Sequence, residues 1–161
     1  MKLKTLIAAA LAPVILLAGC SSGNGRNTAV ADIEPTEIVN AVLTEVSINS
    51  SIEKGKNDIP DFYSELDTSQ VESASFAICA SGAYPDEIAV MKCTDISAAA
   101  DVKTAFEKRL ASQTELFSTY TPDEMYKLET AKIYTVENYA IFLALSDNSR
   151  AKEIVDGKLL S

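Results

Sequence analysis

Residues whose side chains could take part in binding or catalysis lie close together at Tyr84-Pro85-Asp86-Glu87, and Lys92 follows a few positions later. An aromatic ring beside two carboxylates and an amine is typical of a protein-binding surface, because loop tips often carry binding residues and tyrosine is favoured in interfaces. We therefore expect Tyr84, Glu87 and Lys92 to contact a partner. In the alternative interpretation, the ring of Tyr84 folds back as a lid on the core.

Catalytic chemistry has little support in the sequence. There is no histidine, which removes the commonest general base and the commonest transition-metal ligand. Two S-x-x-K matches, at Ser51 and Ser149, and one S-D-N match at Ser146 represent two signatures of serine β-lactamases and penicillin-binding proteins, but the third signature, K-T-G, is absent. We expect a protein that is not an enzyme and has no cofactor or metal.

Four acids, Asp58, Asp61, Glu65 and Asp67, crowd one polar segment. Carboxylates are the ligands that Ca²⁺ prefers, but these four lack the D-x-D-x-D-G spacing of an EF-hand loop. The spacing therefore favours a solvated acidic loop over a calcium site.

The thiols of Cys79 and Cys93 are the remaining reactive groups. A turn at residues 82–86 would leave these two cysteines several residues out of register across a hairpin, which is beyond disulfide distance. We expect two buried free thiols, and a disulfide through a shifted register is the alternative.

Hydrophobic periodicity predicts the elements that position these groups. Alternation places Phe76, Ile78, Ile88 and Val90 on one face of the first hairpin, the expected core side. Residues 139–145 are apolar on both faces, which indicates a central strand. The expected elements are a helix from residue 35, a loop at 49–70 with one short turn, a hairpin at 73–81 and 87–94, a helix at 97–119, a short helix from 121, a hairpin at 132–146 and a helix at 148–156 that ends at Gly157.

The two hairpin-plus-helix units share a junction sequence. Residues 95–102 align with residues 147–154 in the pattern D-x-S-x-A-x-acid-aliphatic. The pattern indicates either a ββα repeat or one strand-to-helix junction used twice. In both cases we expect an α+β two-layer sandwich, with an antiparallel sheet of about four strands and helices mainly on one face.

The N-terminus has the composition of a secretory signal peptide, with Lys2 and Lys4 before an apolar run at residues 6–18. Leu17-Ala18-Gly19-Cys20 resembles the bacterial lipobox, which implies a diacylglyceryl group on the thiol of Cys20 and cleavage before it. An ordinary signal peptide followed by a chance cysteine is the alternative. We expect a signal peptide at 1–19, a flexible linker at 20–32 and a single domain at 33–161.

The charge of the chain restricts its partners. Loss of residues 1–19 removes two lysines and no acids, so the net charge changes from −9 to −11. Such acidity opposes binding to nucleic acid, whose phosphates would be repelled, and it opposes close contact with anionic lipid. We therefore expect contact with the membrane only through the N-terminal lipid.

Several segments together carry a family resemblance. The lipobox, residues 84–92 with the sequence YPDEIAVMK, the helix ending in FSTY at 117–120 and Asn138-Tyr139 resemble a family of small uncharacterised bacterial lipoproteins of the domain-of-unknown-function kind. The resemblance implies a single domain on the outer face of a Gram-positive cell membrane, and the periplasmic face of a Gram-negative membrane is the alternative.

The resemblance to this family does not imply any particular activity. We expect an extracytoplasmic lipoprotein that binds a protein partner at the cell envelope. A small-molecule-binding module and a carboxylate-dependent envelope hydrolase are the two alternatives.

Overall fold

A single antiparallel sheet organises the computed structural model, which describes residues 30–160. Its strand order is β1-β2-β3-β5-β4. Strand β5 lies between β3 and β4 and is buried at every position, so the predicted central strand is confirmed. The strands are β1 (Ser51–Gly55), β2 (Val71–Cys79), β3 (Glu87–Cys93), β4 (Lys132–Val136) and β5 (Tyr139–Ala144).

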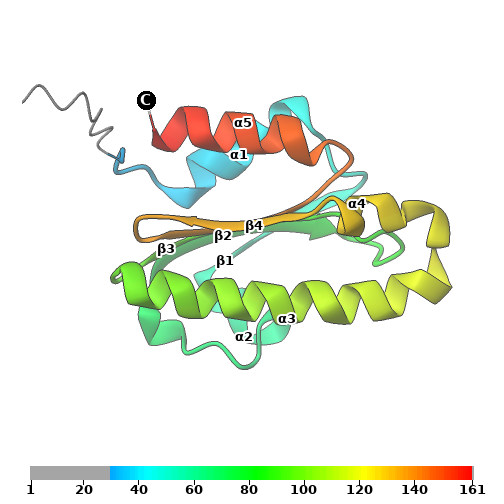
Figure 1. Cartoon of the computed structure of the whole chain (residues 1–161), viewed down its shortest axis with the longest axis horizontal. Helices are drawn as coiled ribbons and strands as arrows, with labels where there is room; N and C mark the ends of the chain where they lie inside the picture. The colour runs from blue at the N-terminus through cyan, green and yellow to red at the C-terminus, as the bar shows by residue number, and fades with distance from the viewer. Residues whose placement is uncertain (1–29, 161) are drawn as a thin grey trace, which may run out of the picture.

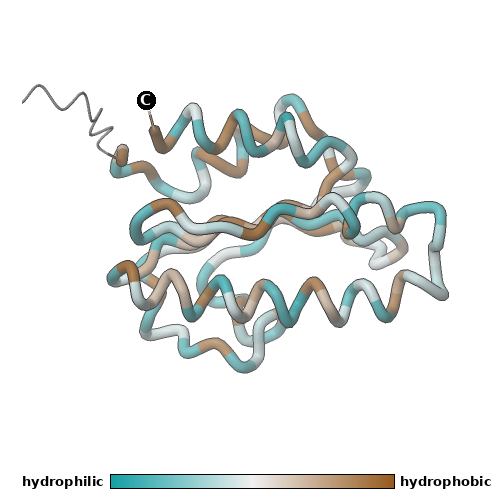
Figure 2. Tube along the Cα trace, viewed as in Figure 1, coloured by the Kyte–Doolittle hydropathy of each residue, from teal (hydrophilic) through white to brown (hydrophobic). Residues whose placement is uncertain are grey.

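Helices cover both faces of this sheet (Figure 1). The long helix α3 (Ile96–Tyr120) lies on one face with the short helix α2 (Ile59–Phe62), and α1 (Pro35–Glu45) lies beside α5 (Asn148–Leu159) on the other. Each face has its own apolar core, and Figure 2 shows brown, hydrophobic stretches along the sheet between the two helical layers.

The α+β class is thus confirmed, whereas the two-layer arrangement and the count of about four strands are wrong. The physical reason is that the inner strands are apolar on both faces, so each face must be covered.

The β2–β3 hairpin pairs in a different register from the expected one, in which a turn at residues 82–86 would place Cys79 opposite Ala89. Phe76 pairs with Ala89, and Ala77 pairs with Ile88. Directly paired residues point to the same face, so Phe76 packs beneath α3 while Ile88 and Val90 pack beneath α1 and α5. The expected grouping of Phe76 with Ile88 and Val90 is wrong, because a register shift by an odd number of residues turns every side chain to the other face.

Strand β1 was not expected. It pairs with β2 at the edge of the sheet, and its first three side chains are exposed. A short edge strand with polar residues gives no alternating apolar pattern, so residues 49–70 were expected to be a loop. The same segment also contributes to the core, because Tyr63 and Leu66 are buried beneath α3.

The shared junction sequence forms the same cap twice. The carboxylate of Asp95 accepts a hydrogen bond from the backbone N–H of Ala98 at 2.8 Å, and Asp147 accepts one from Arg150 at 2.9 Å. However, α3 and α5 cover opposite faces of the sheet (Figure 1). A rotation that exchanged the two antiparallel hairpins would keep both helices on one face. The two ββα units are therefore not related by rotation, and the shared sequence is explained by cap chemistry.

The other helices follow their predictions closely. Helix α1 begins at Pro35, as expected, and α3 exceeds its expected range by one residue at each end. The short helix expected from residue 121 is a 3-10 turn that begins at Pro122 and leads into α4 (Met125–Glu129). Helix α5 does not end before Gly157, because Leu159 is fully buried against the sheet and extends it. None of the helices within residues 30–160 has the length and hydrophobicity needed to cross a bilayer. The expected signal peptide and Cys20 lie outside the described residues.

Candidate binding site

The three residues predicted to bind a partner do not lie together. Tyr84 lies in the loop between β2 and β3 and is 37% exposed, whereas Glu87 begins β3 and is fully buried. Lys92 lies about 17 Å further along the strand, where its Nζ atom is 2.7 Å from an oxygen of Asp32. This hydrogen bond raises the pKa of Lys92. The expected exposure of Glu87 is wrong. Of the three predicted residues, only Tyr84 is exposed on the loop.

Glu87 is the centre of a buried hydrogen-bond network. Its carboxylate accepts hydrogen bonds from the hydroxyl of Tyr63, from Nε of Arg109 at 3.0 Å and from Nε2 of Gln113 at 2.7 Å. Glu87 points toward α3 because it is paired with Ile78 on that face. Arg109 and Gln113 are one helical turn apart and approach from the same side. We call these four residues, Tyr63, Glu87, Arg109 and Gln113, the Glu87 cluster.

The protonation of the Glu87 cluster follows from burial and charge. Burial, and after it the charge of Glu87, raises the pKa of Tyr63 well above its ordinary value, so the hydroxyl stays protonated and donates. Burial lowers the pKa of Arg109, but attraction to Glu87 more than compensates and the pKa is raised overall. The cluster therefore pairs one carboxylate with one permanent cation.

A second charged group lies on the other side of Tyr84. The Nζ atom of Lys127 is 2.7 Å from an oxygen of Asp86 and 2.6 Å from an oxygen of Glu124. The same amine is 5.6 Å from the centre of the Tyr84 ring and 5.9 Å from that of Tyr126. We call Asp86, Glu124 and Lys127 the Lys127 cluster.

Lys127 is held as an ammonium. Burial lowers its pKa, but the hydrogen bonds to Asp86 and Glu124 outweigh this effect and raise the pKa overall. A nucleophilic lysine needs a lowered pKa, so this environment does not prepare Lys127 for covalent catalysis. The ring of Tyr84 lies beside this ammonium and remains 37% exposed, so Tyr84 does not fold back completely as a lid on the core.

Two hollows share Tyr84 as a wall. The first, which we call the Gln113 pocket, has a volume of about 210 Å³ and lies between α3 and the β2–β3 loop. The second has a volume of about 520 Å³ and lies against the Lys127 cluster and the turn at residues 47–50. The residues of the Gln113 pocket that matter below are Phe62, Ile78, Tyr84, Arg109, Gln113 and Leu116.

Exposed apolar side chains line these hollows or contact residues that line them. Tyr84 and Leu116 line one pocket, Tyr126 flanks the same ammonium as Tyr84, and Tyr120 packs on Phe117 with ring centres 6.4 Å apart. They make up four of the seven large exposed apolar side chains within residues 30–160. We call Tyr84, Leu116, Tyr120 and Tyr126 the Tyr84 surface.

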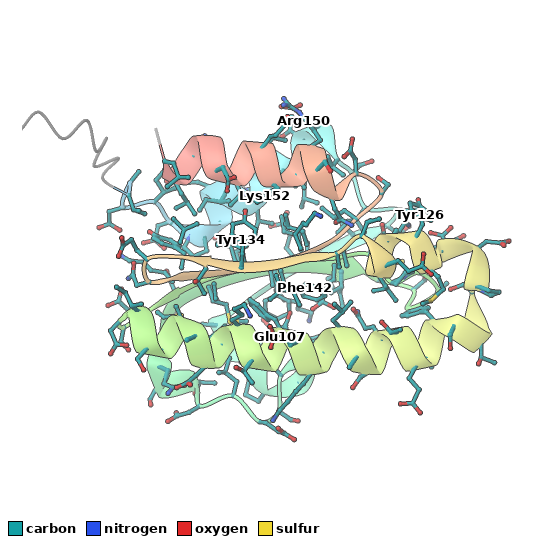
Figure 3. The ribbon with its side chains drawn as sticks, viewed as in Figure 1. Glu107, Tyr126, Tyr134, Phe142, Arg150 and Lys152 are labelled. Carbon is teal, nitrogen blue, oxygen red and sulfur yellow. The ribbon has the colours of Figure 1, made fainter. Side chains whose placement is uncertain are left out.

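The Tyr84 surface lies at one end of the molecule. Helix α4, the C-terminal end of α3 and the β2–β3 loop meet at this end, while residue 30 and the C-terminus lie at the other (Figure 1). Tyr126 is labelled at this end in Figure 3. The start of the described chain and the Tyr84 surface are therefore on opposite sides of the domain.

Cys79 and Cys93 are buried free thiols, as predicted. Burial, and after it the charges of Asp95 and Glu72, raises the pKa of Cys93 to about 12. Burial also raises the pKa of Cys79, but hydrogen bonds from Ser81 and the following backbone outweigh it and lower the pKa overall. The two thiols therefore differ in their tendency to form a thiolate.

The acidic segment before β2 has structural partners. Asp58 accepts a hydrogen bond from the backbone N–H of Gly55, Asp67 accepts one from Ser69, and Glu65 pairs with Lys108. No group of three metal-ligating side chains converges anywhere in the described range 30–160. Asp58 and Asp67 therefore order the turns on which they lie, and Glu65 joins the segment to α3.

Sequence reasoning missed Arg109, Gln113 and Lys127. A signal for the first two was present, because they follow Phe106 by three and seven positions and so lie on the buried face that ends at Phe117. Two polar residues on the apolar face of a helix indicate a buried polar partner, since unpaired polar groups are costly to bury.

The family comparison covers this site. No curated protein sequence and no solved structure matches the chain. Residues 45–145 match the family described as a domain of unknown function, DUF4358. The matched range extends from before β1 to the end of β5, so it includes the Glu87 cluster, the Lys127 cluster and the Tyr84 surface. On this match over most of its length, the chain belongs to the DUF4358 family, a domain of unknown function.

Proposed function

We propose that the protein is an extracytoplasmic lipoprotein, anchored through a lipid on Cys20, that binds a protein partner at the cell envelope through the Tyr84 surface. The observation that carries this proposal is the gathering of exposed apolar side chains at the end farthest from residue 30 (Figure 1). An anchor before residue 30 would leave that end directed away from the membrane. The envelope face is that of a Gram-positive cell, or the periplasmic face of a Gram-negative membrane.

The composition of the Tyr84 surface supports a protein partner. Leu116 is 60% exposed and Tyr120 is 65% exposed, so both leave apolar area in water that a partner would cover. Aromatic side chains are enriched where protein interfaces are energetically strongest. Glu115, Asp123 and Glu129 are exposed next to the surface. The partner that fits presents an apolar patch bordered by basic residues.

The hydrolase alternative has weaker support. Hydrolysis by two carboxylates needs separate acid and base roles, which arise when the two environments differ. Asp86 and Glu124 instead share the ammonium of Lys127, and Glu87 is paired with Arg109. These contacts favour a binding module without enzymatic activity.

Crosslinking in living cells tests the proposal. A photoreactive residue at Tyr120 should capture one envelope protein, whereas the same residue at Ile96 should not. Ile96 is a matched control because it is 62% exposed on the same helix, at the opposite end. The paired substitution Tyr84→Ala and Tyr126→Ala should reduce the captured product at least fivefold at an unchanged level of anchored protein. Equal capture from Tyr120 and Ile96 would contradict the assignment of the surface.

The anchor has its own test. Cys20→Ala should prevent incorporation of labelled lipid and release the protein into the medium or periplasm, and Cys79→Ala serves as the control. Retention of Cys20→Ala in the membrane fraction with normal processing would show that Cys20 is not the anchor.

A further inference from the structure

Gln113 has an unused hydrogen-bond acceptor beside a pocket. Its side chain is only 5% exposed, and its Nε2 atom donates to the carboxylate of Glu87. A carboxylate only accepts hydrogen bonds, so this contact fixes which end of the amide is nitrogen. The Oε1 atom has no hydrogen-bond partner among residues 30–160. A buried amide oxygen left unpaired destabilises a protein, so a donor from a ligand would relieve it.

The other residues that line the pocket indicate which chemical groups a ligand would carry besides this donor. Phe62, Ile78 and Leu116 give the pocket an apolar lining. Arg109 lies over the Phe62 ring at 5.7 Å and also lines the pocket. Its Nε and Nη2 atoms contact Glu87, which leaves Nη1 outside this ion pair as a donor. The pocket thus combines the free acceptor of Gln113, a donor on Arg109 and an apolar lining, and the carboxylate of Asp86, which is paired with Lys127, also lies in its wall.

We propose that the Gln113 pocket binds an uncharged amide attached to one apolar side chain. The N–H of the amide donates to Oε1 of Gln113, its C=O accepts from Arg109, and the side chain packs against Phe62, Ile78 and Leu116. Two sources present this chemistry, a segment of a partner protein and a free acylated amino acid amide. The proposal therefore goes beyond the proposed function, because it holds for either source.

Charge and size favour this ligand over others. A carboxylate placed at Arg109 would also approach the buried carboxylate of Glu87, and like charges repel strongly where water is excluded. An uncharged amide avoids this repulsion. Pockets for drug-sized ligands start at about 300 Å³, whereas this pocket has a volume of about 210 Å³, which suits a single side chain.

Two matched probes test the proposal on the mature chain carrying Cys20→Ala. N-acetylphenylalanine amide is uncharged, and N-acetylphenylalanine differs from it only by a carboxylate. In an NMR titration, the uncharged probe should shift the side-chain amide signals of Gln113 and should bind at least tenfold more tightly than the charged probe. Leu116→Ala should weaken the uncharged probe at least threefold, and Ile96→Ala should leave its affinity unchanged.

The outcomes separate the two sources and the two proposals. If the uncharged probe also reduces crosslinking from Tyr120, a partner segment is the source, and binding without this competition indicates a free molecule. Binding of the probe in a protein that captures no partner would reject the proposed function and keep the pocket assignment. Equal affinity for both probes, shifts confined to residues away from Gln113, or no binding at the solubility limit of the probe would overturn the pocket assignment.

Discussion

Arg109 reaches from α3 to Glu87 at the start of β3, with Nη2 2.9 Å from a carboxylate oxygen that is fully buried. The ion pair joins the helix to the central part of the sheet at the point where the Gln113 pocket opens. Because Gln113 donates to the same oxygen, the pair also holds the amide that we assign to ligand binding.

Removal of the Glu87 carboxylate should be strongly destabilising. Glu87→Ala would leave the partly buried Arg109 without its counter-charge and Tyr63 and Gln113 without their acceptor. Loss of one partner of a fully buried ion pair costs about 3–5 kcal/mol, which is an upper bound here because Arg109 is 26% exposed. Chemical denaturation should show a loss of at least about 2 kcal/mol, because Glu87 itself is fully buried and has three hydrogen-bond partners. Glu53→Ala, which removes an exposed glutamate from β1, should change the free energy of unfolding by less than about 0.5 kcal/mol. Similar losses for both variants would contradict the structural role of Glu87.

One buried and one partly buried tyrosine, Tyr63 and Tyr134, should make the fold sensitive to alkali. Burial, and after it a neighbouring carboxylate, raises the pKa of both Tyr63 and Tyr134 above the ordinary value of 10.0. Above this pH the unfolded chain loses tyrosine protons that the folded chain retains, so unfolding becomes more favourable as pH rises. The contribution of these protonated tyrosines to the free energy of unfolding is complete below pH 10 and is lost progressively as the pH rises above 10.

The midpoint of urea unfolding, measured as a function of pH, checks this prediction. The midpoint should fall more steeply above pH 10 in the wild type than in Tyr134→Phe, which keeps the ring and removes the titrating hydroxyl. Tyr120→Phe is the control, because Tyr120 is 65% exposed and should not alter the slope. Identical slopes for the wild type and Tyr134→Phe would contradict the prediction.

Local sequence patterns predicted most elements of the fold. Helical spacing and Pro35 located α1, and the capping carboxylates of Asp95 and Asp147 located the starts of α3 and α5. The layering was harder to predict. Strand β3 is nearly all apolar, and alternation cannot assign the faces of a strand that is buried on both. The exposed edge strand β1 gave no apolar signal.

The candidate site was predicted less well, and for a different reason. Tyr84 was found because its residue type and its loop location both indicate an interface. Glu87 was assigned to the surface because glutamate is almost never fully buried unless paired. Its partners lie 22 and 26 positions further along the chain, and no local spacing links residues so distant in sequence.

Two glycines should respond in opposite directions to alanine. Gly157 lies within α5, and a Cβ atom there would meet nothing within 4 Å. Alanine has the higher helix propensity, so Gly157→Ala should raise the free energy of unfolding by about 0.5–1 kcal/mol.

Gly82 has a φ of +65°, which other residues adopt with strain. Gly82→Ala should therefore lower the free energy of unfolding by about 1 kcal/mol. Urea denaturation of the two variants side by side measures both changes. A destabilising Gly157→Ala would show that α5 does not continue through this position.

The two buried thiols should react with alkylating reagents at different rates. The thiolate is the reactive form, and hydrogen bonds at the β2–β3 loop lower the pKa of Cys79 while burial raises that of Cys93 to about 12. Cys79 also lies at the end of its strand, next to a loop with exposed residues, where local opening should need less free energy than at the fully buried Cys93.

Iodoacetamide should therefore modify Cys79 at least tenfold faster than Cys93 in the Cys20→Ala protein at neutral pH. Mass spectrometry of the peptides that contain each cysteine gives both rates in one sample. The variants Cys79→Ala and Cys93→Ala show that neither rate depends on the other thiol. Denaturant should bring the two rates close together, because the unfolded chain removes both the loop hydrogen bonds and the burial. If Cys93 reacted first in the folded protein, the β2–β3 loop could not hold Cys79 as the more acidic thiol.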